Sequence, residues 1–130
     1  MQQLLTPENI DAVMKVYHGF HDAQINWVVF RPSHIDNYIV NAEAELWVTN
    51  HSTCKAEVVR LIFHELLEMR FSYNSKYDYS NIQDDIAIGF HEELAHVDFG
   101  GACEPRTTPD DYRELDRYFI CKSVSLTIVT

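Results

Sequence analysis

The chain has 130 residues, the size of one ordinary domain. Hydrophobic residues make up 46% of it and there are only 4 Gly and 4 Pro, which excludes disordered, collagen-like and linker-rich chains. With 10 Lys and Arg against 20 Asp and Glu, the formal net charge is −10, which disfavours a general nucleic-acid binder and a protein held on anionic lipid. We expect a single domain over residues 1–130.

The N-terminus and the cysteines predict a cytoplasmic protein. Residues 1–8 lack the basic and then apolar pattern of a signal peptide, and no stretch approaches the roughly 20 apolar residues of a membrane helix. Cys54, Cys103 and Cys121 match neither a disulfide framework nor a CxxC motif. We therefore expect three reduced, largely buried thiols and no membrane contact.

A helix is expected over residues 6–18. Thr6 is a good N-cap, and Pro7 suits the first helical position because its missing N–H is not needed there. An apolar stripe with the spacing i, i+3, i+4, i+7 consists of Ile10, Val13, Met14 and Tyr17. Gly19 ends the helix.

From residue 20 onward the period changes to two, which is typical of strands. Strands are expected over residues 25–30, 40–49, 82–90 or 86–90, 94–99 and 118–129. Between them we expect a turn at 33–37, a long tyrosine-rich loop at 72–85 and a short helix around 112–115.

Residues 55–71 fit two patterns. As a helix they would align Val58, Leu61, Ile62, Leu66 and Met69 on one face. We favour two strands separated by a bulge at His64–Glu65, because the flanking segments are strand-like. The expected fold is α+β: a mainly antiparallel sheet of six or seven strands over residues 20–130, with the N-terminal helix packed on it.

The common enzyme signatures are missing from the sequence. It has no GxxxxGK[ST] or GxGxxG phosphate loop and no GxSxG nucleophile motif. In the zinc-protease-like segment at 64–68, Glu68 replaces the second histidine. His91 and His96 are five residues apart, which separates them on a helix or on a single strand. Histidines and carboxylates could still meet through the fold, as His64 would meet Glu68 on a helix, but we expect no metal centre and no cofactor.

His21 and Asp22 form the most suggestive polar pair, at the junction between the expected helix and the first strand. A structural role explains them, because Asp22 can accept backbone N–H groups in a turn and His21 can donate to a free carbonyl. A catalytic role would need a nucleophile from Ser33, Cys54 or Cys121. The pair stays open as a candidate ligand site.

The segment Phe20–Ala23 (FHDA) follows the expected helix and precedes a strand. In this it resembles a group of small bacterial β-rich proteins, some of which are immunity proteins of polymorphic toxin systems. The segments Arg60–Phe63 (RLIF) and Glu68–Phe71 (EMRF) fit the same group. The resemblance implies a cytoplasmic binding protein that blocks a toxin and has no catalytic residues.

Acidic and tyrosine side chains predict a binding surface in the second half of the chain. Residues 77–105 contain seven acids and no Lys or Arg. Tyrosines beside charge of one sign are typical of interfaces, where the rings supply buried area and the charges speed encounter. The expected partner-binding residues are Tyr73, Tyr77, Tyr79, Asp84, Asp85, Glu92 and Glu93. The alternative is a solvated acidic edge that keeps the protein soluble.

Three functions are compatible with these patterns. We favour a non-enzymatic protein-binding domain with a basic protein partner, such as a toxic nuclease whose cleft attracts phosphates. The second is a small-ligand or metal-dependent enzyme that uses His21, Asp22 and other histidines in a pocket between helix and sheet. The third is the structural subunit of a homo-oligomer, such as a homodimer formed through the Trp27/Val28/Phe30 face or an open sheet edge.

Overall fold

The computed structural model describes residues 2–32, 39–72, 85–100, 108 and 117–129. Several sequence predictions lie outside the described residues: the turn at 33–37, the helix around 112–115, Cys103, and the site residues Tyr73, Tyr77, Tyr79 and Asp84.

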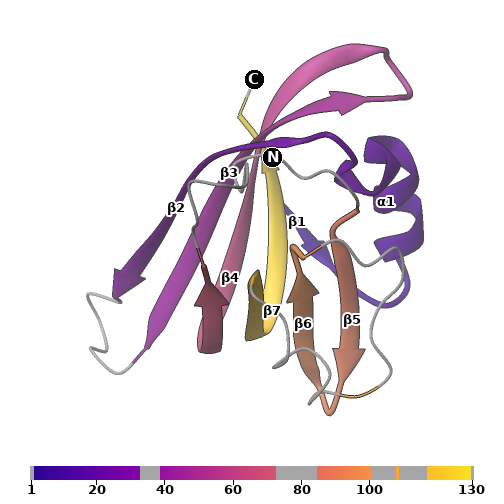
Figure 1. The fold of residues 1–130 in the computed structure, drawn as a ribbon. Helices are drawn as coiled ribbons and strands as arrows, with labels where there is room; N and C mark the ends of the chain where they lie inside the picture. The colour runs from indigo at the N-terminus through magenta and orange to yellow at the C-terminus, as the bar shows by residue number, and fades with distance from the viewer. Residues whose placement is uncertain (1, 33–38, 73–84, 101–107, 109–116, 130) are drawn as a thin grey trace.

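Within the described residues, one antiparallel sheet of seven strands carries a short helix against one side (Figure 1). The helix α1 (Ile10–Tyr17) continues into a 3-10 turn, η1 (His18–Phe20). The strands are β1 (Gln2–Leu5), β2 (Gln24–Pro32), β3 (Val40–Asn50), β4 (Lys55–Phe71), β5 (Ala87–His91), β6 (Leu94–Asp98) and β7 (Arg117–Ile128). Their order is β2-β3-β4-β7-β6-β5, with β1 also paired to β7. The expected α+β class is confirmed.

Strand β7 joins the N-terminal and C-terminal parts of the sheet. One of its edges pairs with β4 from Arg117 to Ile128. Its other edge is divided, because residues 118–121 pair with β6 and residues 124–127 pair with β1. Three segments that are far apart in the sequence therefore meet on β7.

The N-terminal segment differs from the sequence prediction in two ways. Residues 2–5 form β1, which is too short to show a period in the sequence. The helix begins at Ile10 and not at Thr6, because residues 7–9 form a turn. Thr6 N donates to Asn9 Oδ1 (2.8 Å), and Asn9 N donates to Thr6 Oγ1 (3.3 Å), so these two residues close the turn. The N-cap is Asn9, so the prediction of Thr6 as the N-cap is wrong, and Ile10 N donates to the backbone carbonyl oxygen of Thr6 (3.0 Å).

Residues 55–71 form a strand, and the helical alternative is wrong. They make one continuous strand and not two, but the predicted irregularity is present: Glu65 has a φ of +50°, and the register against β7 shifts between Leu66 and Glu68. The pairing of β4 with β3 runs only as far as Phe63, and beyond it β4 continues on β7. His64 and Glu68 therefore do not share a helix face.

The core lies between α1 and the sheet. Alternate residues of β3 and β4 point into it, as the period of two predicted. Phe63 of β4 stacks on Phe119 of β7 with ring centroids 4.1 Å apart, and both rings are fully buried. From α1 the buried residues are Ile10, Val13 and Tyr17.

The two described cysteines differ in their exposure. Cys121 is buried in the core, and its burial raises the pKa of the thiol to about 12, which makes it unreactive. Cys54 is exposed on the turn after β3, so the expectation of a buried thiol is wrong for this residue. Among the described residues, no helix has the length and apolar character needed to cross a membrane.

Strands β5 and β6 form a hairpin with a two-residue turn. His91 pairs with Leu94, and the turn residues Glu92 and Glu93 have φ of +55° and +64°. Positive φ at both positions matches the twist of the strands but is unfavourable for residues with a Cβ, so Asn-Gly is the usual sequence there. The hairpin also brings the rings of His91 and His96 to 5.2 Å, which corrects the prediction that they are separated. That prediction assumed a single strand, whereas the turn lies between them.

The hairpin turn provides a stability test. Replacing Glu92 and Glu93 with Asn and Gly (E92N/E93G) relieves two unfavourable backbone conformations, so the free energy of unfolding should rise by about 1 kcal/mol. Urea unfolding followed by circular dichroism measures this change.

The matched control is E92Q/E93Q, which removes the same two charges and keeps the side-chain length. It should leave the unfolding free energy within about 0.5 kcal/mol of wild type, as for ordinary surface substitutions. Equal stabilisation by both variants would attribute the effect to charge and contradict the backbone explanation.

Candidate functional site

The FHDA segment lies in a strained turn between α1 and β2. His18, Gly19, Phe20 and Asp22 all have positive φ, from +53° to +66°. A bulky residue such as Phe20 rarely adopts this conformation, and such residues cluster at functional sites. The turn is held by its buried members, because Phe20 is fully buried and stacks on Tyr17 (ring centroids 5.1 Å apart).

The turn presents His21 between two carboxylates. His21 Nε2 lies 3.5 Å from Asp22 Oδ2, and His21 Nδ1 lies 3.7 Å from Asp85 Oδ1. The side chains of His21, Asp22 and Asp85 are 45%, 74% and 32% exposed, so all three can be reached from solvent. Asp85 is one of the predicted partner-binding residues, and the fold brings it to the other candidate pair.

Gly19 is required for this arrangement. The N–H of Ile86 donates to the Gly19 carbonyl oxygen (2.8 Å), which ties the segment before β5 to the turn. A Cβ on Gly19 would lie only 2.7 Å from Asp85 Cγ, and its φ of +66° also disfavours a side chain. The close approach of Asp85 therefore depends on a residue without a side chain.

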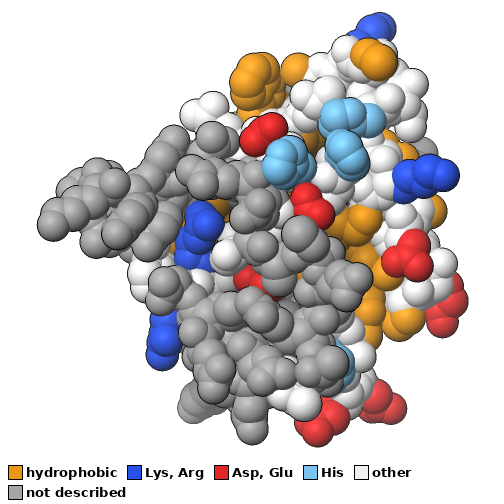
Figure 2. Space-filling view, turned by 45° about the vertical axis from the view of Figure 1, so that its right-hand side comes forward, with side chains coloured by type: hydrophobic (Ala, Val, Ile, Leu, Met, Phe, Trp, Pro, Cys, Tyr) orange, Lys and Arg blue, Asp and Glu red, His pale blue; other side chains and the backbone are white. Residues whose placement is uncertain are grey.

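His18 and His51 lie at the same end of the molecule, although sequence reasoning did not select them. Their rings contact edge to face with centroids 4.9 Å apart, and His51 N donates to the Val16 carbonyl oxygen (2.8 Å). Figure 2 shows histidine and acidic side chains gathered on the side where α1 lies. We call His18, His21, Asp22, His51 and Asp85 the junction surface. Within the described part of the chain, no group of three or more His, Cys, Asp or Glu residues could hold a metal ion.

A buried tyrosine links the junction surface to the β3–β4 hairpin. Burial raises the pKa of Tyr17 to about 12, helped by the charge of Glu57 and by a hydrogen bond to its carboxylate. The same carboxylate also accepts a hydrogen bond from Asn50, whose Nδ2 lies 2.8 Å from Glu57 Oε1. The C-terminal end of α1 is therefore fixed to the hairpin that carries His51.

The other predicted site residues are spread over the molecule. Glu92 and Glu93 are exposed at the far end of β5, about 20 Å from Asp85 by the usual rise of a strand. Of the proposed nucleophiles, Cys121 is in the core, Cys54 is on the turn after β3, and Ser33 lies outside the described residues. His21 contacts its carboxylates at distances beyond those of a working proton relay, which are about 2.6–3.2 Å.

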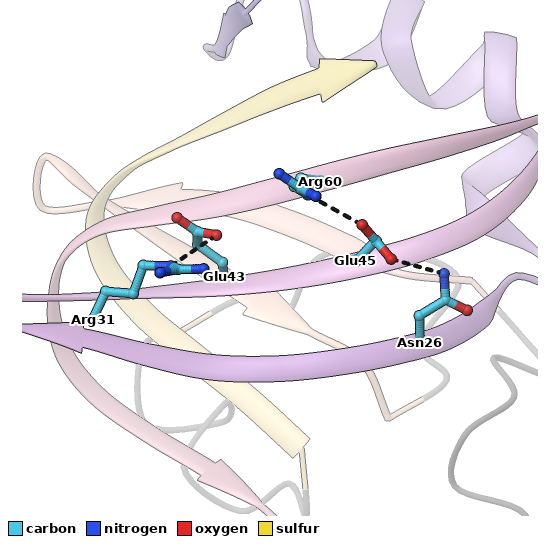
Figure 3. Close-up of polar contacts among 5 residues, drawn as sticks. All are labelled: Asn26, Arg31, Glu43, Glu45 and Arg60. Carbon is cyan, nitrogen blue, oxygen red and sulfur yellow. Dashed lines mark hydrogen bonds and ion pairs between the residues drawn. The ribbon is translucent and has the colours of Figure 1, made fainter. Parts of the chain in front are cut away.

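The exposed face of β2, β3 and β4 carries ion pairs that cross the strands (Figure 3). Arg31 contacts Glu43 at 3.2 Å, and Arg60 contacts Glu45 at 3.1 Å. Asn26 also donates to Glu45 (3.1 Å). These pairs largely neutralise the acids of this face.

The proposed Trp27/Val28/Phe30 face is not one surface. Trp27 pairs with Glu45 on the exposed side, where Arg60 lies over its ring at 5.4 Å. Val28 pairs with Ala44 on the opposite side of the sheet, as neighbours in a strand must. Val28 and Phe30 therefore share one side of β2 and Trp27 lies on the other, and the homodimer stays a prediction.

Comparison of the chain with protein-family models, with curated proteins and with solved structures found no match. What the junction surface does must therefore be inferred from its own residues.

The contact between Gly19 and Asp85 can be tested with a double-mutant cycle. G19A should lower the free energy of unfolding by about 2 kcal/mol or more, through the positive φ and the clash with Asp85. In a D85A background the clash is absent, so the same substitution should cost only about 1 kcal/mol. Urea unfolding of the four proteins measures both values, and equal costs in the two backgrounds would contradict the contact.

The Tyr17 network predicts a loss of stability in alkali. Because the pKa of Tyr17 is raised from 10.0 to about 12 in the folded protein, its stabilising effect is complete below pH 10 and lost as the pH rises towards 12. At pH 11 the stability advantage of wild type over Y17F should be smaller by roughly 1 kcal/mol than at pH 8. Urea unfolding at both pH values measures it, and parallel losses in the two proteins would show that Tyr17 is not responsible.

Proposed function

We propose that this protein is a cytoplasmic binding protein whose junction surface engages a basic protein partner without catalysing a reaction there. The observation that carries the proposal is the approach of Asp85 to His21 at 3.7 Å. It joins the two sites that the sequence selected for separate reasons, the FHDA segment and the acidic segment, in one exposed surface.

The charge and the backbone of this surface support the proposal. Asp22 and Asp85 share one histidine, so even a fully charged imidazole would leave one carboxylate unbalanced. Acidic side chains held on a rigid turn attract a basic partner and lose little conformational entropy on binding. The overall charge of −10 adds to this attraction at a distance.

We further propose that the partner is a toxin and that this chain acts as its immunity protein. The FHDA, RLIF and EMRF segments, which resemble those of such proteins, support this assignment. A toxin that cleaves nucleic acid needs a basic cleft, and a rigid acidic surface is a suitable plug for it.

Two variants with the same net charge test the binding surface. D22N/D85N removes two charges from the junction surface and keeps side-chain shape, whereas E8Q/D11N removes two exposed charges near the start of α1. A basic protein captured from the native lysate and identified by mass spectrometry provides the ligand for titrations at low and high salt. D22N/D85N should weaken the affinity about tenfold or more and reduce its salt dependence, and E8Q/D11N should change it less than about twofold.

Equal effects of the two variants would mean that overall charge alone attracts the partner, and would contradict the junction surface as its site. The immunity role has its own readout: the captured protein should inhibit growth when expressed alone and should be harmless when expressed with this chain. A captured protein that is harmless alone would contradict that role while leaving the binding surface supported.

A further inference from the structure

The bend in β4 opens a pocket on the face of the sheet that points away from the core. β4 parts from β3 after Phe63, and the N–H of Glu65 then donates to Asn41 Oδ1 (2.9 Å). The resulting open pocket has a volume of about 590 Å³. It is lined by Gln2, Leu4, Ile39, Asn41, His64, Glu65, Ser123 and Ser125.

Within the pocket the hydroxyl of Ser125 lies between Gln2 and His64. Gln2 Nε2 donates to Ser125 Oγ at 2.7 Å, and His64 Nε2 lies 2.8 Å from the same oxygen. An amide nitrogen can only donate, so the oxygen accepts from Gln2 and the hydroxyl proton remains available for His64. This serine is only 2% exposed, which keeps the hydroxyl away from bulk water.

The register of the strands produces this arrangement. Ser125 on β7 pairs directly with Leu4 on β1 and with Ile62 on β4. Gln2 lies two residues before Leu4 and His64 lies two residues after Ile62, so both are diagonal neighbours of Ser125 on the same face. The three side chains therefore converge through backbone pairing and not through a flexible loop.

We propose that Ser125 is a nucleophile and His64 its general base, in an acyl-transfer site for small uncharged esters. In the imidazole tautomer with its proton on Nδ1, Nε2 accepts the proton of Ser125, and their separation lies within the range of about 2.6–3.2 Å for such pairs. None of the residues involved belongs to the junction surface, so this proposal is independent of the proposed binding function.

The reaction balances with water as the only co-reactant. Ser125 Oγ forms a bond to the ester carbonyl carbon while its proton passes to His64 Nε2. The bond to the leaving alcohol then breaks, and the alcohol oxygen takes the proton from His64. A water molecule that gives a proton to His64 attacks the acyl group, and the carboxylic acid leaves as Ser125 Oγ recovers a proton from His64.

The lining of the pocket defines the substrate class. Leu4 and Ile39 are the apolar side chains of the lining and suit a short acyl or alkyl group. Glu65 also belongs to the lining, and its carboxylate and the net charge of −10 both oppose an anionic ester. The low exposure of Ser125 favours small substrates over macromolecular ones.

The probes for this site are a small fluorophosphonate and p-nitrophenyl acetate. Intact and peptide mass spectrometry should place a covalent adduct on Ser125 of the wild-type protein. S125A should abolish labelling and ester hydrolysis, and H64Q, which cannot take the proton, should slow both about a hundredfold or more. S52A is the control, because Ser52 is exposed on the turn between β3 and β4 and does not line the pocket, and it should react at the wild-type rate.

Three results would overturn the proposal: no adduct on Ser125 in the wild-type protein, labelling of S125A at the wild-type rate, or labelling of H64Q at the wild-type rate. Circular dichroism and the thermal unfolding midpoint verify that each variant is folded. Should S125A fail to fold, the adduct position in wild type and the rate of H64Q decide the question without it.

Discussion

The pairing between β4 and β7 is the constraint on which the rest of the sheet depends. It runs from the Val59–Ile128 pair to the Phe71–Arg117 pair, and it leaves the other edge of β7 for both β6 and β1. The stacking of Phe63 on Phe119 in the core fixes these two strands relative to each other. A slip of one residue would reverse the faces of β7 and turn Ser125 into the core, so the register also determines the pocket.

The bend in β4 divides the sheet into a part that supports α1 and a part where β4 no longer pairs with β3. Before Phe63, β4 and β3 pair in a regular ladder that supports α1 and the junction surface. After it, the backbone of Glu65 leaves the ladder, and Asn41 satisfies its N–H. A buried or half-buried N–H without a partner would lower the stability by about 1–3 kcal/mol. The hydrogen bond to Asn41 avoids this loss where β4 separates from β3.

The junction surface illustrates how strain is kept in place by packing. Residues other than glycine with positive φ cost of order 1–3 kcal/mol each, and this turn contains His18, Phe20 and Asp22 in that conformation. Full burial of a phenylalanine ring stabilises by about 1.5–3 kcal/mol, so Phe20 offsets part of the strain. The hydrogen bond from Ile86 to the Gly19 carbonyl adds a second anchor from a distant segment. The exposed side chains of His21 and Asp22 are consequently held by the buried residues on either side of them.

Periodicity was sufficient to predict the fold class and most strands, because each strand has a buried and an exposed face. It failed for β1, which has four residues, and for the start of the helix, where a Thr6–Asn9 turn takes the place of the first helical turn. The predicted number of strands agrees with the structure only because two errors cancel: β1 was not predicted, and β4 was predicted as two strands. Contacts between distant segments could not be predicted from local patterns. The sequence around His21 does not indicate a contact with Asp85, and the sequence around His64 does not indicate one with Ser125. Only Gly19 carried a local signal, since a glycine at a helix end indicates positive φ.

Strand pairing also decides where negative charge remains exposed. On the face of β2, β3 and β4, Glu43 and Glu45 each contact an arginine of a neighbouring strand, at 3.2 and 3.1 Å. Such exposed pairs contribute at most about 1 kcal/mol to stability, but they cancel the potential of that face. At the junction surface, Asp22 and Asp85 both contact the same imidazole, that of His21, at 3.5 and 3.7 Å, whereas each glutamate of the other face contacts its own arginine. Under the proposed function, a basic partner is therefore guided to the junction surface by the contrast between these two faces and not by the total charge alone.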